Sequence, residues 1–218
     1  MKLEQNKWSE SARWDNVLEM SFSADLVLGF GKRQLLENSE RFEEIRSFYP
    51  SADIVLCSTA GEIPDVEVFD DSIVITALQF ERTVIKSRQI SLKGNWTSDS
   101  GMERELTSLF PYENLEHVLL LSHGLNVNGA RLIEGMKAEL NHSVSIIGGL
   151  AGDRPDFVKS VVGLNEAPSE NKMVAVREEI GEETMMTGFY SYGELGPDRQ
   201  GNSCYLHNQT MTMTLLSE

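Results

Sequence analysis

The sequence predicts an α+β fold, in which helices flank a mixed and largely antiparallel β-sheet. Apolar runs of strand length recur along the 218 residues, and three segments have helical periodicity: 39–49, 102–110 and 130–140. The strand patterns at 72–80 and 84–92 follow each other with no helix between them, which argues against a doubly wound parallel sheet. A single sheet and two facing sheets, the latter as an αββα sandwich, both satisfy this pattern.

The chain opens with a predicted helix followed by a buried strand. Apolar side chains recur at loosely helical spacing over residues 9–20, which predicts an amphipathic helix. Residues 24–31, ADLVLGFG, form a compact apolar run closed by glycine and are predicted to be a buried strand. Three apolar residues share one face of a helix over 40–48, which Ser39 can cap and Pro50 ends.

The middle of the chain alternates strands with polar connections. Residues 53–57, DIVLC, predict a second buried strand that runs into the turn-like sequence at 58–62. The strands at 72–80 and 84–92 are separated by a short polar connection, which predicts an antiparallel hairpin. A polar loop then leads to the helix at 102–110, which a proline ends.

The second half repeats the order of strand, loop and helix. Residues 117–122 predict a buried strand, 123–129 the loop that leaves it, and 130–140 a helix with four apolar residues at helical spacing. A short strand at 144–147 then runs into a glycine-rich loop at 148–153, GGLAGD.

The last third is predicted to be rich in strands, at 157–163, 172–180, 186–190 and 210–215. The final strand ends three residues before Glu218, which fits a fragment of a longer protein as well as a natural C-terminal strand. No internal repeat, low-complexity segment or linker divides the chain. We therefore expect one domain over residues 1–218.

Charge and composition exclude several classes of partner. Acidic residues outnumber basic ones by 34 to 19, and a surface with a formal charge of −15 repels a phosphate backbone. We therefore expect no nucleic-acid partner. No apolar run approaches the roughly 18 residues that span a bilayer, and no secretory signal precedes the domain, so we expect no membrane insertion and a cytoplasmic location. Cys57 and Cys204 are too few for a disulfide framework and form no CxxC metal pair.

Three loops combine small residues with hydrogen-bonding ones, and each follows a predicted buried strand. They are CSTAGE at 57–62, SHGLNVNG at 122–129 and GGLAGD at 148–153. The carboxyl ends of strands line the usual ligand crevice of α/β sheets, where small residues let backbone N–H groups approach a ligand. The predicted ligand-binding residues are Ser58, Thr59, Gly61, Glu62, His123, Asn126, Asn128, Gly129, Gly149, Ala151, Gly152 and Asp153.

A hydrolase or transferase is an alternative, with Cys57 or Ser58 as nucleophile. His123 could serve as its base if the strands at 53–57 and 117–122 were neighbours, with Glu62 or Asp153 orienting the imidazole. The GxSxG elbow is absent, and a cysteine ending an apolar strand is more often a small buried hydrophobe. We expect no enzyme.

Metal and nucleotide sites have little support in the sequence. The four histidines form no i, i+4 pair and no HExxH motif, so we expect no metal site, although a haem needs only one axial histidine. Residues 29–34 lack the third glycine of the dinucleotide motif, and no GxxxxGK phosphate loop is present.

Taken together, these motifs resemble the N-terminal half of the FIST sensory domain, the domain of F-box and intracellular signal transduction proteins. The resemblance spans nearly the whole chain: ADLVLGFG at 24–31, YPSADIVLCSTAGEI at 49–63, SIIGGLAGD at 145–153, MVAV at 173–176 and Thr187-Gly188-Phe189. STAGE and GGLAGD in this order are fairly specific, whereas the strands between them are generic.

The resemblance implies an intracellular sensory domain that binds a small polar ligand, such as an amino acid, and relays the event to partner modules. Family members occur with chemoreceptor, histidine-kinase and cyclic-dinucleotide output domains, and a C-terminal domain usually follows. Some bacterial members bind haem and sense nitric oxide, so a haem-based gas sensor is the second alternative.

The chain departs from the family pattern at four positions. Leu56 and Arg154 stand where the family commonly has glycine, His123 stands where an acidic residue is frequent, and Ser160 replaces a threonine. These differences leave the expected fold unchanged, but they put in doubt whether the ligand matches that of better-studied relatives.

Overall fold

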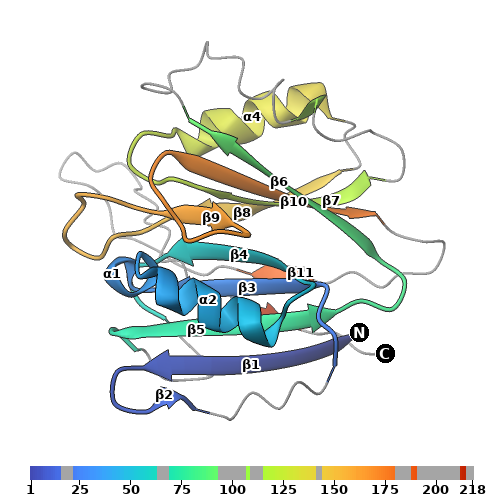
Figure 1. Ribbon diagram of the computed structural model, residues 1–218. Coiled ribbons are helices and arrows are strands. Elements are labelled where there is room, and N and C mark those ends of the chain that lie inside the picture. Colours follow the sequence, from blue (N-terminus) through green and yellow to red (C-terminus); the bar gives the residue numbers. More distant parts are fainter. Residues whose placement is uncertain are drawn as a thin grey trace.

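Two β-sheets form the centre of the molecule (Figure 1). The computed structural model describes residues 1–15, 22–62, 69–92, 107–108, 115–140, 144–179, 188–190 and 212–214. The larger sheet has six strands in the order β2 (Arg13–Trp14), β1 (Lys2–Ser9), β5 (Ser72–Gln79), β3 (Leu26–Gly31), β4 (Asp53–Ser58) and β9 (Val162–Leu164). The smaller sheet has four, in the order β6 (Val84–Ser91), β10 (Lys172–Glu179), β7 (Leu115–Ser122) and β8 (Ser145–Leu150). A separate pair consists of β11 (Gly188–Tyr190) and β12 (Thr212–Thr214).

The six-stranded and the four-stranded sheet each contain one parallel pair of neighbouring strands. β3 runs parallel to β4 in one sheet, and β7 runs parallel to β8 in the other. The chain connects β3 to β4 through α1 (Arg33–Leu36) and α2 (Ser39–Phe48), and β7 to β8 through α4 (Gly129–Glu139). A parallel pair requires such a crossover, because its strands start at the same end of the sheet. No helix in the described ranges is long and apolar enough to span a membrane.

Apolar side chains fill three layers, which makes the fold an αββα sandwich. Along β4, Ile54 and Leu56 belong to the layer under α2, whereas Val55 and Cys57 belong to the layer between the two sheets. β7 alternates in the same way between the layer under α4 and the inter-sheet layer. Figure 1 shows α2 and α4 on the outer sides of the two sheets. The predicted α+β class with mixed sheets is confirmed, in its two-sheet form.

The predicted helix at 9–20 is wrong over its described part. Residues up to Ser9 belong to β1, which pairs antiparallel with the full length of β5, and β2 follows at Arg13–Trp14. Arg13 takes a positive φ of 60° in the turn between the two strands. Long-range pairing and burial of Trp8 under α2 outweigh the weak helical spacing of the apolar residues. The predicted residues 16–20 lie outside the described residues.

The predicted hairpin between 72–80 and 84–92 is also wrong, although both strands exist. β5 pairs with β1 and β3 in the larger sheet, whereas β6 pairs with β10 in the smaller one. The short polar connection therefore carries the chain from one sheet to the other. A local turn signal cannot distinguish this crossing from a hairpin, because the partner strands lie far away in the sequence.

Three boundaries differ from those predicted. Residues 148–150 of the predicted GGLAGD loop belong to β8, and the strand predicted at 157–163 is reduced to β9, because residues 153–161 form an irregular segment. The helix at 40–48 is confirmed as α2, but Asn38 rather than Ser39 caps it, its side chain accepting from the Glu40 N–H at 3.0 Å. Apart from residues 107–108, the helix predicted at 102–110 lies outside the described residues.

Candidate functional site

The carboxyl ends of the two parallel pairs meet at one place in the sandwich. After β4, the Thr59 N–H donates to the Gly31 carbonyl at the end of β3, at 3.1 Å. After β8, the Ala151 N–H donates to the Ser122 carbonyl at the end of β7, at 2.7 Å. The Gly152 N–H then donates to the Ser58 carbonyl at 2.8 Å, which joins the two sheets. We call this meeting place of the carboxyl ends of β3, β4, β7 and β8 the junction. All three loops predicted to share a site start from it.

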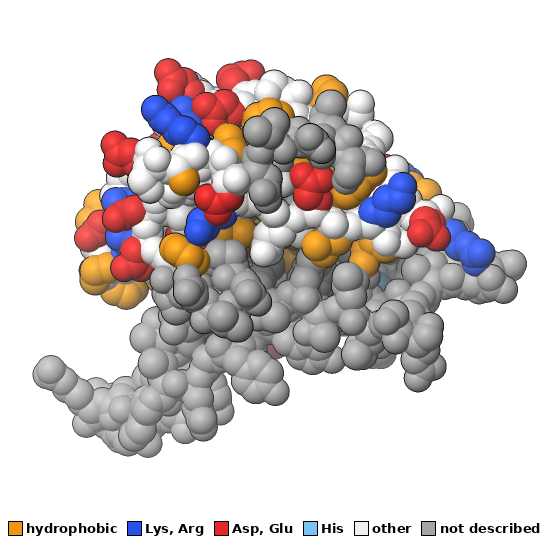
Figure 2. Space-filling model, turned by 90° about the horizontal axis from the view of Figure 1, so that it is seen from below, with side chains coloured by type: hydrophobic (Ala, Val, Ile, Leu, Met, Phe, Trp, Pro, Cys, Tyr) orange, Lys and Arg blue, Asp and Glu red, His pale blue; other side chains and the backbone are white. Residues whose placement is uncertain are grey.

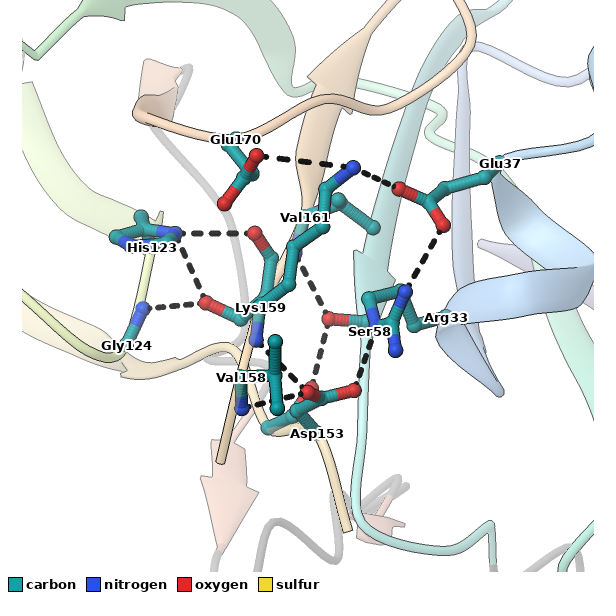
Figure 3. A network of polar contacts seen from close by, with 12 residues as sticks. Arg33, Glu37, Ser58, His123, Gly124, Asp153, Val158, Lys159, Val161 and Glu170 are labelled. Carbon is teal, nitrogen blue, oxygen red and sulfur yellow. Dashed lines mark hydrogen bonds and ion pairs between the residues drawn. The ribbon is translucent and has the colours of Figure 1, made fainter. Parts of the chain in front are cut away.

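Ser58 fastens the junction with its side chain. Its Oγ donates to the Gly152 carbonyl at 2.8 Å and accepts the Val161 N–H at 2.9 Å (Figure 3). The residue is fully buried. Both hydrogen-bonding roles of the hydroxyl are taken by backbone groups, so Ser58 holds the segment 153–161 against β4.

Asp153 organises the segment that follows β8. Its Oδ1 accepts the Arg33 Nε–H at 2.6 Å, and its Oδ2 accepts the N–H groups of Val158 and Lys159 at 3.0 and 2.8 Å (Figure 3). Burial raises the pKa of Asp153, but the hydrogen bonds from Arg33 and the two backbone groups outweigh it and hold that pKa below its ordinary value. Arg33 also pairs with Glu37 at 3.1 Å, so an ionised Asp153 is tied to α1.

Glu62 is a buried carboxyl group held by two hydroxyls. The Thr59 Oγ1 donates to its Oε1 at 2.5 Å, and the Ser72 Oγ donates to its Oε2 at 2.8 Å. Only 4% of the residue is exposed, and this burial raises the pKa of Glu62 to about 7, although the two hydroxyls and the charge of Arg154 lower it. In the described part of the chain, no Lys or Arg side chain forms an ion pair with this carboxyl group.

His123 follows β7 and is also buried. Its Nδ1 lies 3.0 Å from the Ser160 carbonyl oxygen and 2.9 Å from the Ser160 Oγ, which also accepts the Gly124 N–H at 2.9 Å (Figure 3). Ser160 lies in the same 153–161 segment that Asp153 and Ser58 hold. The segment 153–161 is therefore held by Ser58 from the larger sheet and by the loop after β7 from the smaller one.

The remaining predicted residues take different places around the junction. Asn128 caps α4, its Oδ1 accepting the Arg131 N–H at 3.2 Å, and Gly129 is the first residue of that helix. Asn126 is exposed in the same loop. Gly149 lies within β8, Ala151 is buried in the inter-sheet layer, and Gly61 is half-buried beside Glu62.

Two glycines allow the loops to approach so closely. A Cβ on Gly124 would lie 2.0 Å from the Ala151 carbonyl oxygen, and a Cβ on Gly152 would lie 2.9 Å from the Ala60 backbone nitrogen. Both contacts are shorter than real Cβ atoms show. Glycine at these positions lets the loop after β8 lie between the loop after β4 and the loop after β7.

The geometry contradicts the arrangement expected for a nucleophilic enzyme. Cys57 is fully buried in the inter-sheet layer, and burial raises the pKa of its thiol to about 12, far from the lowered value of a reactive cysteine. The Ser58 Oγ contacts backbone groups and not His123, whose Nδ1 contacts Ser160 instead. Neither predicted nucleophile has the predicted base.

Two of the four histidines, His117 and His123, lie in the described residues. His123 is 1% exposed, and its Nδ1 lies against the carbonyl oxygen and the hydroxyl of Ser160. His117 lies at the other end of β7, away from the strand's carboxyl end. His142 and His207 lie outside the described residues.

Three contributing residues are absent from the predicted set. Arg33 follows β3, so the rule that selected the other loops, namely the carboxyl end of a buried strand, also applies to it. Ser72 begins β5, and Ser160 lies in an irregular segment. These two had no sequence signal, because their role depends on long-range pairing.

A family model described as the FIST N domain matches residues 25–196, which include all four strands of the junction and the segment after β8. A search of curated proteins found no match.

Proposed function

The chain belongs to the FIST N domain family of signal-transduction sensory domains, and from that premise we propose that it binds a small polar ligand at the junction of the four strand ends. One observation carries the proposal: the Gly152 N–H donates to the Ser58 carbonyl, so loops from both sheets share one place. A ligand that contacts these loops would bear on both sheets at once. Relay to a signalling partner and a cytoplasmic location of the chain are part of the proposal.

The chemistry of Glu62 favours a ligand with an ammonium group, such as an amino acid. Its carboxyl group is buried and accepts two hydroxyl hydrogen bonds, yet no cation pairs with it in the described residues. A buried carboxylate without a cation is costly, so a ligand ammonium at this place would gain a charge-assisted hydrogen bond. Thr59 would orient the same group through its hydroxyl.

Four of the predicted residues, Ser58, Asp153, Glu62 and Asn126, divide into two roles under this proposal. Ser58 and Asp153 have their polar atoms engaged by neighbouring groups and build the floor of the site. Glu62 and Asn126 retain hydrogen-bonding capacity toward a ligand.

Isothermal titration of the full chain against a panel of amino acids tests the proposal. We expect at least one to bind, and Glu62→Gln to weaken that binding tenfold or more, because it removes the charge and keeps the size. Glu40→Gln is the matched control, since the Glu40 side chain is 74% exposed on α2. Failure of every amino acid to bind at about 1 mM would overturn the amino-acid assignment. Equal binding by Glu62→Gln would overturn the role of Glu62.

A further inference from the structure

Arg154, in the loop after β8, has a backbone conformation that an arginine rarely adopts. Its φ is 51°, in the left-handed region where a Cβ is unfavourable and glycine is the ordinary residue. The preceding residue, Asp153, is buried and fixed by Arg33 and by two backbone N–H groups, which hold the chain at this point. A bulky residue kept in such a conformation directs attention to what its side chain does.

Glu62 is attached to both ends of the segment 69–72. The Glu62 N–H donates to the Phe69 carbonyl at 2.9 Å, and the Phe69 N–H donates to the Glu62 carbonyl at 2.7 Å. At the other end of the segment, the Ser72 Oγ donates to the Glu62 Oε2 at 2.8 Å. The buried carboxyl group therefore lies against these four residues.

Arg154 binds the middle of the same segment. Its Nη2 lies 3.2 Å from the Asp70 Oδ1, and its Nη1 lies 3.3 Å from the Asp71 Oδ1. The charge of Arg154 lowers the pKa of Glu62, and by more than the charge of Asp70 raises it. A basic group and a buried acidic group thus share one short segment and act on each other.

The two ion pairs of Arg154 are of a weak kind. The side chains of Asp70 and Asp71 are 71% and 67% exposed, and solvent screens such pairs. Asp71 also pairs with Lys32 at 2.5 Å, so it keeps a cation if Arg154 turns away. Figure 2 shows acidic and basic side chains side by side over one face of the molecule, so pairing of this kind is ordinary on its surface.

One nitrogen of the Arg154 guanidinium is not satisfied by these aspartates. Nη2 is buried from solvent, and within the described residues it forms no hydrogen bond, although the Asp70 Oδ1 is 3.2 Å away. A buried N–H without an acceptor costs free energy, which an oxygen of a ligand would recover. A carboxylate matches the fork of a guanidinium through two parallel hydrogen bonds.

We propose that Arg154 binds the carboxylate of an amino acid whose ammonium group binds Glu62, and so selects amino acids over amines that lack the carboxylate. This inference rests on the proposed function, which has a ligand ammonium at Glu62. The two charged groups of an α-amino acid are attached to one carbon, so they suit an acidic and a basic group on one short segment. A simple amine would bring its charge near Arg154 without an anion to offset it, and the guanidinium would repel it.

Isothermal titration of each amino acid beside the amine that lacks its carboxylate tests this role, with L-alanine against ethylamine and L-phenylalanine against phenethylamine as examples. The wild type should bind the amino acid about tenfold or more tightly than its amine. In Arg154→Gly this ratio should fall below about threefold, since glycine removes the cation and suits the left-handed backbone. Arg13→Gly is the matched control and should keep the wild-type ratio, because Arg13 also has a positive φ, 60°, but is exposed at the start of β2.

A second measurement needs no ligand. Because the charge of Arg154 lowers the pKa of Glu62, Arg154→Gly should raise that pKa, whereas Arg13→Gly should leave it unchanged. The chemical shift of the Glu62 carboxyl carbon, followed by NMR against pH, measures it.

Three results would overturn the role of Arg154 and leave an amino-acid site standing. They are an unchanged pKa of Glu62 in folded Arg154→Gly, equal affinities of the wild type for an amino acid and its amine, and a ratio of affinities that Arg154→Gly does not alter. Failure of every amino acid and every amine to bind would instead overturn the proposed function, and this inference with it.

Discussion

Glu62 and Asp153 are both buried carboxyl groups, yet their surroundings drive protonation in opposite directions. Asp153 accepts hydrogen bonds from a guanidinium and two backbone groups, which favour its charged form. Glu62 accepts from two neutral hydroxyls, and burial raises its pKa to about 7. The sequence placed both in one predicted site, but it could not separate a carboxylate that holds the structure from one that is poised to change charge.

The stability of the protein should fall as pH rises toward neutrality because of Glu62. Its folded-state pKa of about 7 lies above its ordinary value of 4.5, so the folded chain binds more protons between these two values. The free energy of unfolding therefore decreases across this window, by on the order of 3 kcal/mol from Glu62 alone. Urea unfolding at pH 5 and pH 8 measures it.

Glu62→Gln isolates this effect from the other carboxyl groups. The variant should lose less stability than the wild type between pH 5 and pH 8, because glutamine does not ionise. Identical pH dependence in the two proteins would mean that Glu62 does not titrate in this range.

Alanine at Gly124 should destabilise the protein by about 2 kcal/mol or more, because the added Cβ would lie 2.0 Å from the Ala151 carbonyl oxygen. Gly129→Ala is the control, since its Cβ would meet Leu150 at an ordinary 3.5 Å. Thermal unfolding followed by circular dichroism compares them. If the two variants were equally stable, the close approach of the loops after β7 and β8 would be wrong.

At the scale of elements, strands buried on both faces are the features that the sequence predicts best. β4 and β7 alternate between two apolar layers, so their sequences are unbroken apolar runs of the right length. β1 has a mixed pattern and takes its conformation from pairing with β5, so no strand was predicted there. The helix predicted at 9–20 rested on loosely helical spacing of apolar residues. The N-terminal ends of α2 and α4 also depend on side-chain geometry, because the side chains of Asn38 and Asn128 cap these two helices.

Asn128→Ala should lower the free energy of unfolding by about 1 kcal/mol, because the Asn128 side chain caps α4. Asn128→Asp should restore most of that loss, since aspartate accepts the same Arg131 N–H. Chemical denaturation of the three proteins measures the difference. Recovery of stability by aspartate without recovery of ligand affinity would indicate an additional contact between the Asn128 amide and the ligand. If alanine left the stability unchanged, the cap would contribute nothing.

At the scale of the whole molecule, the meeting of the two sheets depends on contacts between residues far apart in the chain. The sequence predicted that loops after buried strands share a site, because the carboxyl ends of parallel strands lie at one edge. The sequence did not predict that each sheet contains one of the two parallel pairs. The strands at 72–80 and 84–92 were predicted as a hairpin, so the change of sheet after β5 was not predicted. Arg33 follows the carboxyl end of β3, so the same rule could have selected it, but its pairing with Asp153 from the other parallel pair was not predictable.

Asp153→Asn should destabilise the molecule by about 3 kcal/mol, because it leaves Arg33 without its buried partner and weakens the hold on the segment after β8. Asp156→Asn is the control, since Asp156 is exposed in the same segment. Unfolding in urea at pH 7 compares them. A loss below about 0.5 kcal/mol in Asp153→Asn would show that the ion pair does not join the two halves.

Hydrogen exchange with and without a bound amino acid tests most directly whether loops of both sheets form one ligand site. We predict that the ligand slows exchange together in residues 58–62, 123–129 and 151–161, which belong to loops from both parallel pairs. Protection confined to the loops of a single sheet, or located away from the junction, would contradict the account.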